Sequence, residues 1–161
     1  MSIEALSQAE IDALITCPQQ VINPSSRVKT EGKHIRRDYH VASLDGRHEF
    51  VLFTRQSTMI VESFSAGLRW RSKTGEEVIL MRCNGPDHTH GNPIERTRFE
   101  FRRHVHRATE RYLAAGRKAE SFAEVTDAYR TLDGALHHLL QLTSISGLNT
   151  SPDATDLFDK A

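Results

Sequence analysis

The chain has 161 residues, of which 38% are hydrophobic and 26% charged, and its formal net charge at pH 7 is zero. This length fits one domain with its own core, and the composition is typical of a globular protein. The chain has no apolar run as long as a membrane span and begins without the basic and apolar segments of a signal peptide, and Cys17 and Cys83 are too few for a disulfide framework. We therefore expect a cytoplasmic protein that has no membrane partner.

The zero net charge hides an uneven distribution along the chain. Residues 1–26 carry 3 acidic and no basic side chains, residues 27–118 carry 19 basic against 11 acidic ones, and residues 119–161 carry 2 basic against 7 acidic ones. A basic centre is typical of a protein with an anionic partner. An acidic C-terminal part that folds over a basic sheet gives the same distribution, so charge alone leaves both interpretations open.

A first helix is predicted to begin after Ser7 and to end before Pro18. Ser7 and Glu10 have the spacing of a capping box, and the apolar residues that follow form one stripe, which suits packing against a sheet. The polar segment "PQQVINPSSR", residues 18–27, predicts a loop.

Residues 33–85 alternate with period two and predict two hairpins, with turns at Asp45-Gly46 and Thr74-Gly75. These turns fix which residues face each other across the strands. The first hairpin pairs Val41 with Phe50 and Tyr39 with Leu52. The second pairs Trp70 with Ile79, Leu68 with Met81 and Ala66 with Cys83. Each hairpin therefore has one apolar face.

The opposite face of both hairpins is predicted to be basic. Its residues are Arg36, Asp38, His40, Arg55, Arg69, Arg71, Val78, Leu80 and Arg82. Arg36 lies directly opposite Arg55, and two facing arginines repel each other unless an anion lies between them. Asp38 is the only acid expected nearby on that face. We interpret the phosphate-binding candidates as Arg36, Arg55, Arg69 and Arg82.

The rest of the chain predicts one more extended segment over residues 99–106 and then helices. One helix ends at Gly116, a second begins at the capping box "SFAE" of residues 121–124, and a leucine stripe predicts a last helix that ends near Gly147.

The predicted fold class is α+β, with an N-terminal helix, an antiparallel meander of four to five strands, and C-terminal helices packed on one face. We expect residues 1–150 to form a single domain and residues 151–161 to form a polar tail that frays.

Two His-x-His pairs are the most distinctive chemical feature: His88 and His90 in "RCNGPDHTHGN", and His104 and His106 in "HVH". Residues i and i+2 of an extended backbone point the same way, so each pair can present both imidazoles to one ligand. A meander brings these segments to the rim where the arginines lie. Three or four imidazoles suit a zinc ion, and three leave the open position that catalysis requires.

The same residues also suit metal-free cleavage of RNA. Histidine acts as general acid or base near neutral pH, and arginine stabilises the charge that develops on a phosphate. Glu100 and Glu110 are further candidate bases. The candidate catalytic residues are His88, His90, His104, His106 and Glu110; no cofactor is required, and zinc on the four histidines is the alternative. A plainer interpretation, in which these histidines are surface groups and Cys83 is a small core residue, is also open.

The run "FSAGLRW", followed by "LMRCNGPDH" and "HVHRATERY", resembles a family of uncharacterised bacterial proteins over about residues 34–140. That resemblance implies a bacterial origin and no particular activity. In architecture, a helix followed by a basic antiparallel sheet and C-terminal helices is similar to the small endoribonuclease toxins of toxin–antitoxin systems, which implies RNA as a substrate.

We therefore expect a protein that binds RNA or another phosphate-bearing ligand and acts as a His/Arg endoribonuclease of toxin type. One alternative is a non-enzymatic interaction protein, of a phage or mobile-element type, whose basic face binds a protein or a nucleic acid. Another is a structural zinc-binding rim. The sequence does not predict the oligomeric state.

Overall fold

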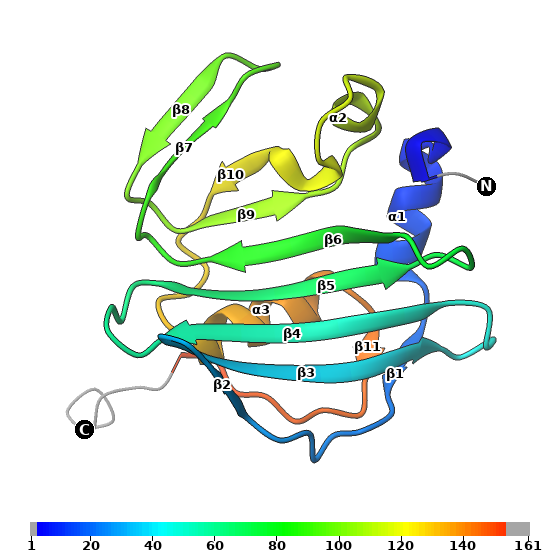
Figure 1. Ribbon diagram of the computed structural model, residues 1–161, viewed down its shortest axis with the longest axis horizontal. Helices are drawn as coiled ribbons and strands as arrows, with labels where there is room; N and C mark the ends of the chain where they lie inside the picture. The colour runs from blue at the N-terminus through cyan, green and yellow to red at the C-terminus, as the bar shows by residue number, and fades with distance from the viewer. Residues whose placement is uncertain (1–2, 154–161) are drawn as a thin grey trace.

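One large, mostly antiparallel sheet forms the centre of the protein in a computed structural model that describes residues 3–153 (Figure 1). The elements in chain order are η1 (Ile3–Ala5), α1 (Gln8–Thr16), β1 (Gln19–Val21), β2 (Lys29–Glu31), β3 (His34–Ser43), β4 (Glu49–Ser57), β5 (Phe64–Arg71), β6 (Glu77–Asn84), β7 (Thr89–Asn92), β8 (Thr97–Glu100), β9 (His104–Arg107), α2 (Glu110–Ala114), η2 (Ala119–Ser121), β10 (Ala123–Val125), α3 (Leu132–Leu142) and β11 (Ile145–Ser146).

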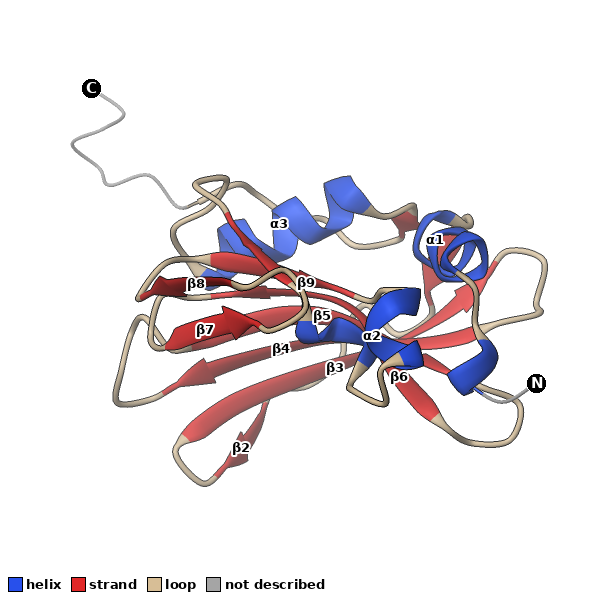
Figure 2. Ribbon diagram, turned by 90° about the horizontal axis from the view of Figure 1, so that it is seen from above, coloured by secondary structure: helices blue, strands red, loops and turns tan. Residues whose placement is uncertain are grey.

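The strand order of the large sheet is β10-β9-β6-β5-β4-β3-β1-β11, with β2 paired to β3 beside this path, while β7 and β8 form a separate hairpin. Helices α1 and α3 lie on the same side of the sheet, and α3 packs over the middle strands β4, β5 and β6 (Figure 2). The predicted α+β class is confirmed, and the predicted meander is the central part, β3 to β6, of a wider sheet. None of the helices within residues 3–153 is long and apolar enough to cross a membrane.

Helix α1 begins as its sequence predicts. The backbone N–H of Glu10 donates to Ser7 Oγ at 3.1 Å, and the N–H of Ser7 donates to the Glu10 carboxylate at 3.1 Å, which completes the capping box. Ile11, Leu14 and Ile15 are buried against the sheet. The turn at residues 45–46 likewise gives the predicted register, with Val41 opposite Phe50 and Tyr39 opposite Leu52.

The second hairpin keeps its predicted register from Ala66, opposite Cys83, to Leu68, opposite Met81. The pairing shifts by one residue between Leu68 and Arg69, so Trp70 lies opposite Val78 and not opposite Ile79. A bulge of this kind moves the following side chains to the other face of the strand. The prediction that Val78 and Leu80 lie on the basic face is therefore wrong.

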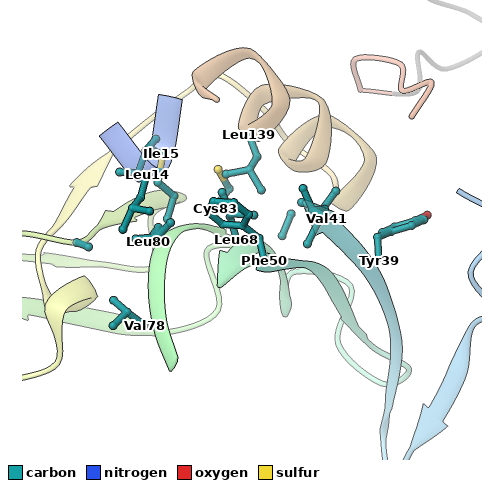
Figure 3. Close-up of a cluster of buried hydrophobic side chains, with 14 of the residues drawn as sticks. Leu14, Ile15, Tyr39, Val41, Phe50, Leu68, Val78, Leu80, Cys83 and Leu139 are labelled. Atoms are coloured by element: carbon teal, nitrogen blue, oxygen red, sulfur yellow. The ribbon is translucent and has the colours of Figure 1, made fainter. Parts of the chain in front are cut away.

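Both residues belong instead to the core between the sheet and its helices. Figure 3 shows Leu80 and Cys83 under α1 and α3, close to Leu139, together with Leu68 and Phe50. The prediction that Cys83 points into the core is thus confirmed, since none of its surface is exposed.

Three predicted elements differ in the structure. The segment 99–106 contains the end of β8 and the start of β9, separated at Phe101, whose φ of 49° breaks the extended backbone. The predicted loop 18–27 contains β1, which pairs with β3 and β11. The "SFAE" segment contains β10 in place of a helix, because its backbone pairs with β9 and bonds to Asn92.

The C-terminal helix ends earlier than predicted, at Leu142, and the chain continues into β11. Asp153, in the predicted tail, accepts hydrogen bonds from the Thr131 N–H and hydroxyl, each at 2.9 Å, at the start of α3. Residues 154–161 of that tail lie outside the described residues.

Candidate functional site

The structure brings the two His-x-His pairs together at one end of the sheet. Ring centroids lie 5.0 Å apart for His88 and His104, 5.7 Å for His90 and His104, 4.9 Å for His90 and His106, and 5.0 Å for His104 and His106. Strand β9 pairs with β6 so that His104 lies opposite Asn84 and His106 lies opposite Arg82. The histidines of β9 therefore share the face that carries the arginines.

The β7–β8 hairpin carries the other pair and lies beside β9 and β10 (Figure 1), and the Asn92 side chain joins it to β10. Its amide donates to the Ala123 carbonyl at 2.8 Å and accepts from the Ala123 N–H at 3.0 Å. Asn92 Oδ1 also lies 2.9 Å from His90 Nε2. Because Oδ1 can only accept, His90 carries its proton on Nε2, and its Nδ1 has a free lone pair.

The two buried histidines are held by backbone carbonyls. His104 Nδ1 donates to the Arg102 carbonyl at 2.8 Å, and His106 Nδ1 donates to the Glu120 carbonyl at 2.6 Å. In both rings Nε2 is therefore the unprotonated nitrogen. Within residues 3–153, His106 Nε2 is buried without a hydrogen-bond partner.

Burial keeps both of these rings neutral. Loss of solvent lowers the pKa of His104 to about 4, and it lowers the pKa of His106 to about 3 with a contribution from the neighbouring charge of Arg82. A ring that is neutral at pH 7 is not a proton donor through Nε2. His104 and His106 are therefore poor candidates for a general acid, whereas His88 is exposed.

The histidine cluster has a geometry that favours stacking over metal coordination. In the part of the chain that the structure describes, no group of three or more His, Cys, Asp and Glu side chains is arranged to hold a metal ion. The planes of His90 and His104 are stacked at 16° to each other. A ligand nitrogen binds a metal in its own ring plane, so these two rings would have to turn before they could share an ion.

The four candidate arginines divide into two that are paired with acids and two that are not. Arg36 lies 3.0 Å from Asp38 and 3.7 Å from Glu31, and Arg69 lies 2.9 Å from Glu77. The expectation that Asp38 is the only acid near these arginines is therefore wrong, because β2 and β6 each supply another. Arg55 and Arg82 form no ion pair with any acid among residues 3–153.

These two unpaired arginines line one polar cleft of about 390 Å³. The other side chains that line it are His34, Ser63, Phe64, Ser65, Asn84, Asp87 and His88. The cleft lies where β4 and β6 end and β3 and β5 begin. Gly85 lies in the chain between the lining residues Asn84 and Asp87, and a Cβ at this position would overlap the Glu62 carbonyl of the β4–β5 loop.

Two histidines in this cleft have defined roles in its hydrogen bonding. His88 Nδ1 lies 2.8 Å from Asp87 Oδ1, so the ring donates to the carboxylate and keeps its Nε2 lone pair free. His34 Nδ1 lies 3.5 Å from Arg55 Nη2, a group that only donates, so the His34 proton is on Nε2. These contacts orient the two rings differently, with Nδ1 of His88 bound to an acceptor and Nδ1 of His34 facing a donor.

Of the predicted site residues, only Arg55, Arg82 and His88 line this cleft. His90, His104 and His106 lie behind it in the cluster. Glu110 begins α2 and is exposed, with its backbone N–H bonded to the Gln8 side chain, and Glu100 is exposed beside Arg98.

Sequence reasoning missed His34, Asp87 and the two serines. The predicted meander contained a signal for His34, since it begins the first strand and thus lies at the same rim. Asp87 directly precedes His88, and an acid beside a histidine is a visible signal for an oriented imidazole.

Fold and site together define an α+β protein with a cationic, histidine-bearing cleft at one end of an antiparallel sheet. The chain belongs to a family of unknown function (DUF6978), whose family model matches residues 6–145. Comparison with curated proteins and with solved structures gives no match. The family agrees with the resemblance to uncharacterised proteins, and no similarity to endoribonuclease toxins accompanies it.

Proposed function

We propose that this protein binds the phosphate groups of RNA between Arg55 and Arg82 and cleaves the RNA there without a metal ion, in the cytoplasm. The observation that carries the proposal is the polar cleft itself, in which two arginines that form no ion pair within residues 3–153 lie beside an Asp87–His88 pair and His34.

The arginines supply the binding part of this proposal. A guanidinium is always charged and presents several donors in one plane, which suits a phosphate better than a single ammonium does. Arg82 is half-buried, and burial lowers its pKa despite the counteracting charge of Glu120. A positive charge held away from water without a close partner gains most from an anionic ligand.

The histidines supply the chemical part. His88 Nε2 accepts the proton of a ribose 2′-hydroxyl, whose oxygen attacks the adjacent phosphorus and forms a 2′,3′-cyclic phosphate. As the bond between phosphorus and the 5′-oxygen breaks, the imidazolium form of His34 donates its Nε2 proton to that oxygen and becomes a neutral ring. Asp87 stabilises the imidazolium that forms on His88, and the arginines stabilise the charge on the phosphorane.

The test is an assay with a fluorescently labelled single-stranded RNA in the presence of EDTA, with products identified by mass spectrometry. We expect shorter fragments that end in a cyclic phosphate, and no cleavage of DNA of the same sequence, which lacks the attacking hydroxyl. His88→Ala and His34→Ala should abolish cleavage, while His40→Ala, an exposed histidine elsewhere on β3, should retain it.

The alternatives give different outcomes in the same experiment. If the protein binds RNA with a steep salt dependence but does not cleave it, it is a non-enzymatic RNA-binding protein and not a nuclease. Cleavage that EDTA abolishes, together with stoichiometric zinc in elemental analysis, would replace the metal-free reaction by one assisted by zinc on the histidine cluster. Absence of both binding and cleavage would overturn the proposal.

A further inference from the structure

A second pocket lies at the other end of the same strands, under α1. It has a volume of about 440 Å³ and is bounded by one side of α1 and by the β3–β4 and β5–β6 turns. Pockets for small ligands in proteins have volumes of about 300–1,000 Å³. This pocket shares no lining residue with the cleft of Arg55 and Arg82.

The pocket exists because α1 presents small side chains toward the turns. Its large residues Ile11 and Ile15 pack into the core, whereas Ala13 and Cys17 line the pocket and leave space in front of Trp70. The indole of Trp70 contacts the His48 ring edge to face, at 6.3 Å between centroids. Together with Leu14, these rings give the pocket a largely apolar wall.

Positive charge surrounds the opening of this pocket. Arg47, Arg71 and Lys73 line it, are exposed, and form no ion pair with an acid in the described part of the chain. The two acids that also line it are already engaged: Glu10 accepts from the Ser7 N–H, and Asp45 accepts from Ser43 and from the Arg47 N–H. The three cations thus outnumber the two acids at the opening of the pocket.

The indole N–H of Trp70 is a further unsatisfied group. Trp70 Nε1 is buried and has no hydrogen-bond partner within residues 3–153. An indole nitrogen can only donate, and a buried donor of this kind is stabilised by any acceptor that reaches it. Within the described residues Trp70 is therefore held by packing alone, so a ligand body that packs against the ring competes with no hydrogen bond of the indole.

We propose that this pocket binds a small amphipathic acid, that is, an alkyl or aromatic body with one carboxylate. The body packs against Trp70 and Leu14, and the carboxylate lies at the opening between Arg71 and Lys73. This site is independent of RNA cleavage, since none of its residues belongs to the nuclease cleft.

Octanoate is the probe for this proposal, with octanol as its uncharged counterpart. Trp70 is the only tryptophan of the chain, so the protein's tryptophan fluorescence reports on this pocket alone. We expect a saturable change of that fluorescence with octanoate and binding at least tenfold weaker with octanol. Cys17, which lines the pocket, should also react more slowly with iodoacetamide when octanoate is bound.

Two variants separate the charge from the cavity. The double variant Arg71→Ala/Lys73→Ala should weaken octanoate binding at least tenfold and leave octanol binding unchanged, and Ala13→Leu should fill the pocket and weaken both. Arg117→Ala/Lys118→Ala removes two exposed cations elsewhere and is the matched control. Octanoate binding that does not saturate, that is no tighter than octanol binding, or that is equal in all variants would overturn the proposal. RNA cleavage by Arg71→Ala/Lys73→Ala should be unchanged whether or not octanoate binds.

Discussion

His106 lies directly opposite Arg82 across the β6–β9 pair, and the two side chains share one face of the sheet. The positive charge of Arg82 is one cause of the lowered pKa of His106, after burial. The ring therefore stays neutral and adds no second positive charge beside the arginine. Arg82 keeps a net positive charge in a half-buried position, which is the property that the proposed phosphate site requires.

The first prediction separates paired from unpaired arginines. Arg55→Ala should weaken RNA binding about tenfold and reduce the slope of log K against log salt concentration by about 1, because one phosphate contact is lost. Arg36→Ala is a matched control, since Arg36 lies directly opposite Arg55 but is bound to Asp38 and Glu31. Fluorescence anisotropy at several salt concentrations measures both, and equal losses in the two variants would contradict the assignment.

The second prediction concerns Asp87. If this carboxylate orients His88 and stabilises its protonated form, Asp87→Asn should lower kcat by about 10²-fold or more and leave RNA affinity nearly unchanged. Single-turnover cleavage and binding, measured on the same preparation, give the two quantities. A loss of affinity that accounts for the whole effect would show that Asp87 acts on binding and not on His88.

The third prediction is a pH dependence of stability from His104 and His106. Both have a folded-state pKa below the ordinary value of 6.5, at about 4 and about 3, so the unfolded chain binds more protons as the pH falls. Their stabilising contribution is complete above pH 6.5 and is lost as the pH falls toward 4 and 3. At pH 5 the loss is about 2 kcal/mol for each histidine relative to neutral pH.

Urea unfolding between pH 7.5 and pH 5 tests this effect. His106→Asn keeps a side-chain donor for the Glu120 carbonyl but does not titrate, and it should remove about half of the pH dependence. His40→Ala serves as the control, because His40 is exposed. A free energy of unfolding that does not change over this pH range would show that the pKa values of His104 and His106 are not lowered in the folded protein.

The fourth prediction concerns Tyr129, which lies under the cleft end of the sheet. Its buried hydroxyl lies 2.8 Å from the Asn84 carbonyl and 2.9 Å from the His104 carbonyl and so joins β6 to β9. Tyr129→Phe leaves these carbonyls without that donor and should lower the free energy of unfolding by about 1–3 kcal/mol. Tyr39→Phe is the comparison, since Tyr39 is buried elsewhere and its hydroxyl lies near Arg37; equal effects in both would argue against a special role for Tyr129.

Local signals predicted the elements that local interactions decide. The capping box of Ser7 and Glu10 and the turn at residues 45–46 are formed by neighbours in the chain, and both are confirmed. The "SFAE" segment has the same kind of local signal, but Asn92, 31 residues away, bonds to Ala123 and the segment becomes a strand. No local pattern contains that contact.

Part of the candidate site was predictable in the same way, because it follows from local signals in the sequence. Period two and the two turns place Arg55, Arg82 and His88 at one rim, and the structure places them in one cleft. Which arginines are neutralised depends on Glu31 and Glu77, and their positions depend on β2 and on a bulge that the turn signals do not reveal.

That bulge determines the electrostatic pattern of the sheet as well as its packing. In an unshifted hairpin, Glu77 would face the helices; with the shift it lies opposite Arg71, on the face of Arg69, and binds Arg69 at 2.9 Å. The inserted residue thus places Glu77 beside Arg69 and neutralises that arginine. Arg55 and Arg82, near the cleft, stay without an ion pair within residues 3–153. The location of the anion-attracting region on this face is set by a backbone irregularity and not by the number of arginines.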